Sequence, residues 1–267
     1  MSLQLADSQS LRVLITGASS GIGETFAREL AGRGYQVTAV ARREERLQVL
    51  MGQLAGEGHR YLVADLATDA GVAVVAEDLA AQRCHLLINN AGFSDFAPFY
   101  SSPLTRQQEM LAVNCNAIVG LSHHFLNQAQ AGDALINLSS IVAVLPTPTQ
   151  PIYSASKAFI ASFSECLWEE QRKRGVYVMG LCPGVTQTEF ISSATGGAAD
   201  GQSLPAALTQ TSAQVVNEAL AALARRRKPI IVTGTVNRLM FALLPRLLSR
   251  FRLLKALAVM GDPERAL

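Results

Sequence analysis

The chain has 267 residues, of which 49% are hydrophobic and 16% are charged, and its formal net charge is +2 at pH 7. Soluble proteins contain about a quarter charged residues, which is more than this chain has. The high apolar content and the formal charge of +2 exclude an acidic disordered chain. The near balance of acids and bases excludes a strongly basic nucleic-acid coat protein. The length suits one large α/β domain with a sizeable buried core.

Short apolar runs alternate with helical patterns through most of the chain. Seven runs are predicted as buried strands, at residues 11–15, 36–41, 60–64, 85–89, 134–138, 176–181 and 229–232. Helical patterns lie between them, near residues 21–33, 43–56, 70–82, 104–131, 151–174 and 212–226. Strands that alternate with helices require right-handed crossovers, which predicts a doubly wound parallel sheet covered by helices on both faces. We expect one domain over residues 1–235 and a helical C-terminal extension of it over residues 236–267.

The stretch 186–211 interrupts this pattern. It is rich in Ala, Gly, Ser, Thr and Gln, contains no base and has no clear period. A stretch of this length without secondary structure is often functional, so we expect either a lid over a site or a variable surface loop.

The cysteines and the N-terminus bear on the compartment. Cys84, Cys115, Cys166 and Cys182 lie at least 16 residues apart and form no zinc-binding pattern, so we expect no metal site. Buried thiols in a reducing cytoplasm are expected rather than two disulfides. Residues 1–10 contain no base and no apolar core, and hence predict no signal peptide. The longest charge-free stretch, 134–156, contains three prolines and predicts no membrane span.

A glycine-rich motif, Thr16-Gly17-Ala18-Ser19-Ser20-Gly21-Ile22-Gly23, lies between the first strand and the first helix. A dinucleotide pyrophosphate needs backbone N–H groups, close approach without side chains, and a helix N-terminus behind it. Gly17 would form the turn, Gly21 would permit the approach, and Gly23 would let the helix lie close to the sheet. The position of the motif after a strand and before a helix strengthens this interpretation.

The end of the second strand bears on which dinucleotide binds. NAD-binding folds of this type place an acid there, and this chain has Ala41 instead, followed by Arg42 and Arg43. The planar guanidinium of Arg42 could hold a 2′-phosphate. Arg43 would either assist or pair with a glutamate of the following helix. The sequence therefore favours NADP(H) over NAD(H).

A catalytic pattern follows the fifth predicted strand. Ser140 stands at the exit of the strand, and Tyr153 and Lys157 stand four residues apart on a helix, so they share one face. Tyrosine has a pKa near ~10, which a neighbouring ammonium and an oxidised nicotinamide would lower. Tyr153 is thus a candidate acid or base, and Ser140 a candidate donor to a substrate carbonyl.

Together these motifs resemble those of the short-chain dehydrogenase/reductase (SDR) family over roughly residues 11–235. The family's Asp after strand three is Asp65, its Asn-Asn-Ala-Gly stretch is Asn89–Gly92, and its active-site Asn is Asn114. Ser140 precedes Tyr153 by thirteen residues, as in the family, and Lys157 completes Tyr-x-x-x-Lys. Pro183-Gly184-Val185-Thr186-Gln187-Thr188 matches the family's Pro-Gly motif. The resemblance implies a Rossmann fold.

The resemblance also implies roles for these residues. Hydride would pass between the nicotinamide and a carbonyl or alcohol carbon, with Tyr153 as acid or base and Ser140 orienting the substrate oxygen. Lys157 would hold the nicotinamide ribose and lower the pKa of Tyr153, while Asn114 would anchor a proton-relaying water. The implied catalytic residues are Asn114, Ser140, Tyr153 and Lys157. The implied cofactor-binding residues are Gly17, Ser19, Ser20, Gly21, Ile22, Gly23, Arg42, Asp65, Leu66, Asn90, Ala91, Gly92, Tyr153, Lys157, Pro183, Gly184, Val185 and Thr188.

The segments expected to line the substrate pocket are mostly apolar and contain no base. They are residues 93–99, 141–145 and 150–152, with the 186–211 stretch. This favours an apolar ketone, aldehyde or secondary alcohol over a sugar phosphate. Asp95 would either recognise a hydroxyl or amine or be merely solvated.

The extension is basic. Residues 225–267 contain ten of the twenty-three bases and two of the twenty-one acids. Leu247, Phe251, Leu254 and Ala258 are predicted to share a stripe of a helix that Pro245 starts or kinks. A basic amphipathic helix can bind a membrane surface. Bases lie close to this stripe, however, which favours a stripe that packs on the domain, covers the substrate pocket or contacts a second copy.

Three functions remain open at this point. The leading one is a cytoplasmic, NADPH-dependent carbonyl reductase or alcohol dehydrogenase acting as a homodimer or homotetramer. The second is a non-catalytic NADPH-binding or sensing protein, against which the complete set of catalytic residues argues. The third is a membrane-surface reductase of lipid-borne carbonyls. No nucleic-acid partner is expected, because the basic extension has few aromatic residues for stacking.

Overall fold

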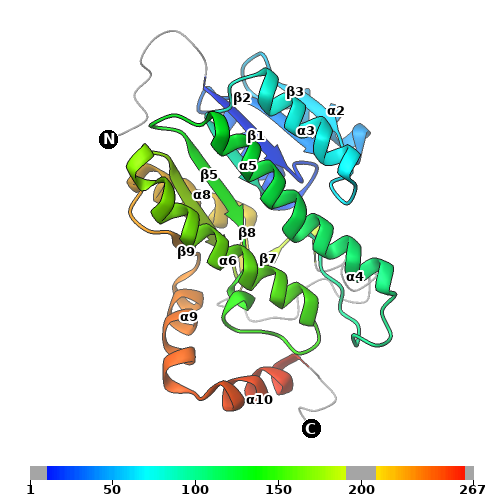
Figure 1. The fold of residues 1–267 in the computed structure, drawn as a ribbon, viewed down its shortest axis with the longest axis vertical. Coiled ribbons are helices and arrows are strands. Elements are labelled where there is room, and N and C mark those ends of the chain that lie inside the picture. Colours follow the sequence, from blue (N-terminus) through cyan, green and yellow to red (C-terminus); the bar gives the residue numbers. More distant parts are fainter. Residues whose placement is uncertain (1–10, 191–208, 262–267) are drawn as a thin grey trace.

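The computed structural model describes residues 11–190 and 209–261, with side chains up to Ala258. Seven parallel strands form one sheet in the order β3-β2-β1-β4-β5-β6-β9 (Figure 1). The strands are β1 (Arg12–Thr16), β2 (Gln36–Ala41), β3 (Arg60–Val63), β4 (Leu86–Asn89), β5 (Ala134–Leu138), β6 (Tyr177–Cys182) and β9 (Ile230–Val232). The predicted doubly wound parallel sheet is confirmed.

Helices cover both faces of the sheet. They are α1 (Gly21–Ala31), α2 (Glu44–Met51), α3 (Asp69–Ala81), α4 (Leu104–Leu111), α5 (Ile118–Gln128), α6 (Pro151–Gln171) and α8 (Ser212–Arg225). Because side chains alternate along a strand, Val13 and Ile15 pack with α1, α2 and α8, whereas Leu14 packs with α3 and α5. Figure 1 shows α3 and α5 crossing in front of the sheet. Both cores are apolar and closed to water.

The order of the strands reverses at β1. This strand pairs with β2 on one side and with β4 on the other. The chain therefore adds β2 and β3 on one side of β1 and then adds β4 and the later strands on the other side. In open parallel sheets, ligands bind in the crevice outside the carboxyl ends of the strands at this point. Thr16 and Asn89 end the two strands, which places the predicted motifs that follow them at one edge.

Two features differ from the predicted elements. The helical pattern over 104–131 contains a π-helical turn, Ala112–Ala117, between α4 and α5. The ends of the 186–211 stretch form two short strands, β7 (Val185–Gln187) and β8 (Thr209–Thr211), which pair in parallel. Neither was predicted from the sequence. Residues 191–208, which hold most of the expected lid or loop, lie outside the described residues.

The extension forms two helices rather than the single amphipathic one that was predicted. Helix α9 (Thr235–Leu247) and helix α10 (Arg250–Gly261) run in different directions (Figure 1). The predicted stripe is wrong, because Leu247 on α9 and Phe251 on α10 are 73% and 66% exposed, while Leu253 is 1% exposed. Of the two expectations for Pro245, that it starts a helix is wrong, since it lies inside the last turn of α9.

The four cysteines are free. Cys84, Cys115 and Cys182 are buried as expected, but Cys166 is exposed on α6, which corrects the expectation that all four thiols are buried. In the part of the chain that the structure describes, no helix is long and apolar enough to cross a membrane.

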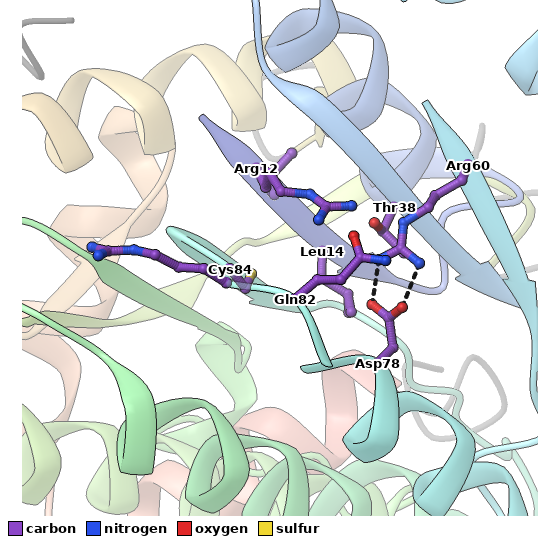
Figure 2. Close-up of a pocket in the computed structure, with 9 residues that line it drawn as sticks. Arg12, Leu14, Thr38, Arg60, Asp78, Gln82 and Cys84 are labelled. Atoms are coloured by element: carbon purple, nitrogen blue, oxygen red, sulfur yellow. Dashed lines mark hydrogen bonds and ion pairs between the residues drawn. The ribbon is translucent and has the colours of Figure 1, made fainter. Parts of the chain in front are cut away.

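A hollow at the opposite, amino edge of the sheet does not resemble a substrate site. It lies among the starts of β1 and β3 and the segment before β4, and Figure 2 shows the Arg60 guanidinium directed at the Asp78 carboxylate beside it. Its volume of about 10 Å³ holds roughly one water molecule. This ion pair fixes α3 to the start of β3.

Gly71 provides a test of how closely α3 packs. A Cβ atom at this position would overlap the backbone carbonyl of Asp65, which precedes the helix. Overpacking of this kind costs typically about 1–3 kcal/mol, so Gly71→Ala should lower the free energy of unfolding by that amount in urea titrations followed by circular dichroism.

Gly120→Ala on α5 is the matched control. A Cβ atom there would lie 3.4 Å from Val72 Cγ1 and would meet no backbone atom within 4 Å outside the turns of its own helix. Alanine in place of a helical glycine stabilises by up to about 1 kcal/mol, so this variant should be at least as stable as the wild type. Equal destabilisation of the two variants would contradict the packing argument.

Candidate active site

Tyr153 and Lys157 lie on one face of α6, one turn apart. The Lys157 ammonium nitrogen lies 5.5 Å from the centroid of the Tyr153 ring. Both side chains are buried, and both stand at the carboxyl end of β5, because Lys157 Nζ donates a hydrogen bond of 2.9 Å to the carbonyl of Leu138. The structure thus brings together the two residues that the spacing predicted.

Burial governs the acidity of Lys157. The loss of water lowers its pKa to about 8, and the nearby Cys115 and Cys182 thiols act in the opposite direction. A buried amine whose pKa is shifted by desolvation is uncommon, and such shifts are frequent at functional sites.

Burial also governs Tyr153, with a result that differs from the sequence-based expectation. It raises the pKa of Tyr153, and a hydrogen bond with the Ser140 side chain counters this only in part. The expected lowering of the Tyr153 pKa is therefore not present in the protein by itself, because desolvation is the largest effect on this pKa and Cys182 raises it further. Without a further positive charge, the phenol stays protonated at neutral pH.

The segment after β5 holds Ser140 beside α6. Ser139 Oγ donates a hydrogen bond of 2.6 Å to the carbonyl of Lys157, which ties the strand end to the helix. Ser140 Oγ accepts from the backbone N–H of Val142 at 3.3 Å. The Ser140 side chain also forms a hydrogen bond with Tyr153, so the two hydroxyl groups lie next to each other.

Asn114 lies in the π-helical turn and is fully buried. Its side chain accepts from the backbone N–H of Phe93 at 3.1 Å and donates to the carbonyl of Phe93 at 3.0 Å. Gly92 lies between Asn114 and Lys157, since a Cβ atom there would lie 2.9 Å from Asn114 Oδ1 and 3.3 Å from Lys157 Nζ. π-Helical turns often occur at functional sites, and here the turn directs Asn114 at the Gly92 segment.

The glycine-rich turn is closely packed against the segment after β4. Asn90 Nδ2 donates to the carbonyls of Thr16 and Gly17, at 2.9 and 3.1 Å. Gly17 has a φ of +66°, and a Cβ atom there would lie 2.8 Å from the Cα of Ala91. At Gly23 a Cβ atom would overlap both Asn90 and Gly17. Only glycine fits these positions, so the backbone of the turn, without side chains, forms a cradle at the N-terminus of α1.

The remaining residues of the predicted cofactor site line the same edge. Ser19, Ser20, Gly21 and Ile22 continue the turn into α1, and a Cβ atom at Gly21 would lie 3.1 Å from Thr188 Cγ2. Asp65 is exposed after β3, where its carboxylate accepts from the N–H of Ala67, and Leu66 beside it is buried.

The two arginines after β2 behave differently. Arg42 is exposed and makes no hydrogen bond or ion pair with a residue that the structure describes. Arg43 donates to Ser19 Oγ and Ser20 Oγ, both at 3.0 Å, and forms an ion pair with Glu189 at 3.3 Å. The predicted pairing of Arg43 with a glutamate of the next helix is therefore wrong. Its partner lies 146 residues away.

The Pro183–Thr188 motif is held by the extension. Pro183 is buried after β6, Val185 begins β7, and a Cβ atom at Gly184 would overlap the side-chain amide of Asn237 on α9. Asn237 is itself buried, and its Nδ2 donates to the carbonyl of Thr233 at 3.1 Å. Sequence reasoning missed Asn237, because a single polar residue in a basic, leucine-rich stretch gives no signal of burial.

Two arginines from other parts of the chain contact the segments that were expected to line the substrate pocket. The Arg106 guanidinium lies 4.0 Å from the centre of the Phe93 ring, and Arg250 donates to the carbonyl of Val144 at 3.5 Å. Asp95 accepts from Ser102 and Gln107, so it ties its own loop to α4. Neither expectation for Asp95, a substrate contact or mere solvation, describes these bonds.

A chain of buried amides beneath the site was also missed. Asn89 Nδ2 donates to Ser122 Oγ at 3.1 Å and to Asn137 Oδ1 at 2.9 Å. Asn137 Nδ2 in turn donates to Ser164 Oγ on α6 at 3.1 Å. Because unpaired buried amides are costly, this chain fixes α5 and α6 relative to β4 and β5.

Phe190 is a further neighbour that the sequence did not indicate. Its ring lies 5.7 Å from the ring of Tyr153, at an angle of 50°. Among the residues that the structure describes, no group of His, Cys, Asp or Glu side chains is arranged to hold a metal ion.

Comparison with known proteins agrees with this geometry. The profile of the short chain dehydrogenase family matches residues 12–197. The chain is 34% identical over 192 residues to sulfoacetaldehyde reductase 2 of Chromohalobacter salexigens, a match that covers 69% of this chain and 76% of that protein. A solved short-chain dehydrogenase from Sphingobium yanoikuyae in complex with NADPH is 30% identical, with a TM-score of 0.76 and 92% of each chain covered.

A second solved structure, a short-chain dehydrogenase/reductase from Burkholderia phymatum in complex with NAD, shares the fold. Its TM-score is 0.78 at 22% identity, over 90% of this chain and 94% of that chain. Nicotinamide cofactors with and without a 2′-phosphate therefore occur among proteins similar to this one. The family match covers more than half of the sequence, and the chain belongs to the short-chain dehydrogenase family of oxidoreductases, which act on alcohol and carbonyl groups.

Proposed function

We propose that the protein is an NADP(H)-dependent oxidoreductase that transfers hydride between the nicotinamide and an apolar ketone, aldehyde or secondary alcohol. The observation that carries the proposal is the buried Lys157 ammonium, 5.5 Å from the Tyr153 ring and hydrogen-bonded to the end of β5. A buried charge costs free energy, and a structural role alone gives no reason to keep it beside a phenol.

The cradle fits a dinucleotide. The glycines let the turn pack closely on the neighbouring segments, because a Cβ atom would clash with Ala91 at Gly17 and with Asn90 at Gly23. The N-terminus of α1 and the backbone N–H groups of the turn suit a pyrophosphate. When bound, the cofactor supplies or accepts the hydride, and its oxidised ring brings a positive charge to the site.

Each catalytic side chain then has a role that follows from its place. Tyr153, protonated because burial raises its pKa, donates its proton to the substrate oxygen during reduction and takes one back during oxidation. The Ser140 hydroxyl donates a hydrogen bond that orients the same oxygen. Lys157 provides positive charge beneath the phenolate as it forms. Asn114 holds the segment of Phe93 and Gly92 that forms the floor.

Arg42 and Arg43 support the preference for NADP(H). Arg42 is exposed without a described partner, and Arg43 lies across Ser19 and Ser20 of the glycine-rich turn. Two guanidinium groups at this edge suit the charge and the planar geometry of a phosphate. No acid occupies the position of Ala41, where NAD-binding folds hold the ribose hydroxyls.

The substrate class is supported by the apolar neighbours of Tyr153 and Ser140. Phe190 and Phe93 contribute rings, and Leu145 is buried after Ser140. Free cysteines fit a reducing compartment such as the cytoplasm. The exposed side chains of Leu104 and Phe159, on α4 and α6, suit a homodimer or homotetramer.

Replacement of the tyrosine hydroxyl tests the catalytic role. Tyr153→Phe should lower kcat for carbonyl reduction by about 10²–10⁴-fold or more, because general acid catalysis of this kind contributes that factor, while NADPH binding persists. The measurement is NADPH oxidation across ketones, aldehydes, steroids and acyl thioesters, with NADPH affinity measured in parallel. Tyr61→Phe, at a half-buried tyrosine of β3 whose hydroxyl donates to Glu44, is the control. Undiminished activity of Tyr153→Phe would contradict the mechanism, and NADPH binding without turnover of any substrate by the wild type would favour a sensor.

Replacement of Arg42 tests the cofactor. Arg42→Ala should weaken NADPH binding about tenfold and leave NADH binding unchanged, since loss of one charge-assisted contact costs roughly 1.5–3 kcal/mol at most. Equilibrium titration of both cofactors measures this. A wild-type protein that binds NADH more tightly than NADPH would refute the assignment.

A second candidate function, a reductase of lipid-borne carbonyls at a membrane surface, is favoured by one observation. Helix α9 turns Asn237 inward and presents Val236, Leu239, Leu243 and Leu247 to solvent. Residues 235–258 contain five bases and no acid. An exposed apolar ridge beside bases suits anionic lipid headgroups.

Vesicle flotation tests this second function. The wild type should float with phosphatidylglycerol vesicles at low salt and not with neutral phosphatidylcholine vesicles, because the bases supply much of the attraction. A Leu239→Asp, Leu247→Asp variant should not float, whereas Val74→Asp, an exposed substitution on α3, should behave as the wild type does. Failure of the wild type to float with either vesicle would remove the membrane function.

A further inference from the structure

Glu189 links the segment after β7 to Arg43 and Arg46 at the start of α2. Its carboxylate accepts from Arg46 Nη1 at 2.7 Å and from Arg43 Nη1 at 3.3 Å. Arg43 at the same time donates to Ser19 and Ser20 in the glycine-rich turn. The segment after β7 is thus held to the start of α2, 143 to 146 residues away in sequence.

The neighbours of Glu189 contact the rest of the site. Thr188 packs on Gly21 of the turn, and its Oγ1 accepts from the backbone N–H of Phe190 at 3.2 Å. The Phe190 ring lies against Tyr153. Thr188, Glu189 and Phe190 therefore contact, in that order, the glycine-rich turn, Arg43 after β2 and the catalytic Tyr153.

We propose that Glu189 is a specificity-determining residue, which competes with the 2′-phosphate of the cofactor for the Arg43 guanidinium and thereby sets the affinity for NADP(H). This inference rests on the proposed NADP(H) preference. In the protein without cofactor the carboxylate holds Arg43, and a 2′-phosphate that binds there displaces it. Arg46 remains as the partner of Glu189.

The competition follows from charge and geometry. A phosphate monoester carries a charge of about −1.5 to −2 and three acceptor oxygens, so it binds a guanidinium more strongly than a carboxylate does. The two anions also repel each other when they share one arginine, since the site is near the surface and only partly screened. Glu189 is 51% exposed, so its removal does not leave a buried charge unpaired.

The test uses adenosine 2′,5′-bisphosphate and adenosine 5′-monophosphate, which differ in the 2′-phosphate and lack the nicotinamide. Titration calorimetry gives the ratio of their affinities for each variant. Glu189→Gln keeps the shape and removes the charge, so it should raise the preference for the bisphosphate about two- to fivefold, the range of exposed ion pairs. High salt should reduce this gain.

Two controls separate the specific effect from a general change in charge. Glu45→Gln removes one exposed carboxylate from the same region and makes no bond to Arg43 among the described residues, so it should raise the preference less. In an Arg43→Ala background, Glu189→Gln should raise the preference no more than Glu45→Gln does, because the shared partner is absent and only the general effect of one charge is left.

The outcomes distinguish this inference from the proposal on which it rests. A wild type that binds the bisphosphate no more tightly than the monophosphate would refute the NADP(H) preference. A wild type that prefers the bisphosphate, with Glu189→Gln equal to Glu45→Gln or equally effective without Arg43, would refute the competition alone. A gain that requires Arg43 supports it.

Discussion

The hydrogen bonds between Asn90 and the end of β1 are the constraint on which the site depends. The loops that follow β1 and β4 run to opposite sides of the sheet, which leaves a crevice between them. Bonds between these two loops must therefore fix their relative positions. Here the Asn90 amide binds the carbonyls of Thr16 and Gly17, while Thr16 Oγ1 accepts from the N–H groups of Asn90 and Ala91. These four bonds hold the turn so closely that only glycine fits at Gly17 and Gly23, and the cradle is therefore a consequence of the packing.

The same principle of fixed polar groups applies at the catalytic end. Lys157 is anchored to the carbonyl of Leu138, and the chain of amides from Asn89 through Asn137 to Ser164 fixes α6 on the sheet. Burial then opposes charge on both Tyr153 and Lys157. A buried site in which the phenol is protonated suits proton donation during carbonyl reduction. During alcohol oxidation, the positive ring of an oxidised cofactor would favour the phenolate form of Tyr153.

The sheet, the glycine-rich turn and the Tyr-Lys pair could be predicted from sequence because each depends on local spacing. The stretches 11–15 and 134–138 are mostly apolar and have the length of a strand, and Tyr153 and Lys157 are four residues apart. The π-helical turn around Asn114 could not, since its side-chain pattern is that of an ordinary helix. The strands β7 and β8 have three residues each, too few for a period. Arg43 and Glu189 meet only through the tertiary fold.

The extension illustrates the limit of dividing the chain by composition. Its basic, leucine-rich sequence marks it as separate from residues 1–235, yet Asn237 packs against Gly184 and Leu253 is buried. Removal of residues 236–267 would therefore open the cofactor side as well as delete the exposed ridge. Any loss of membrane binding or of activity in such a truncation would have two causes. Substitutions at Leu239 and Leu247, which are exposed, change the surface alone. They therefore separate a role of the extension in membrane binding from its role in packing against the Gly184 segment.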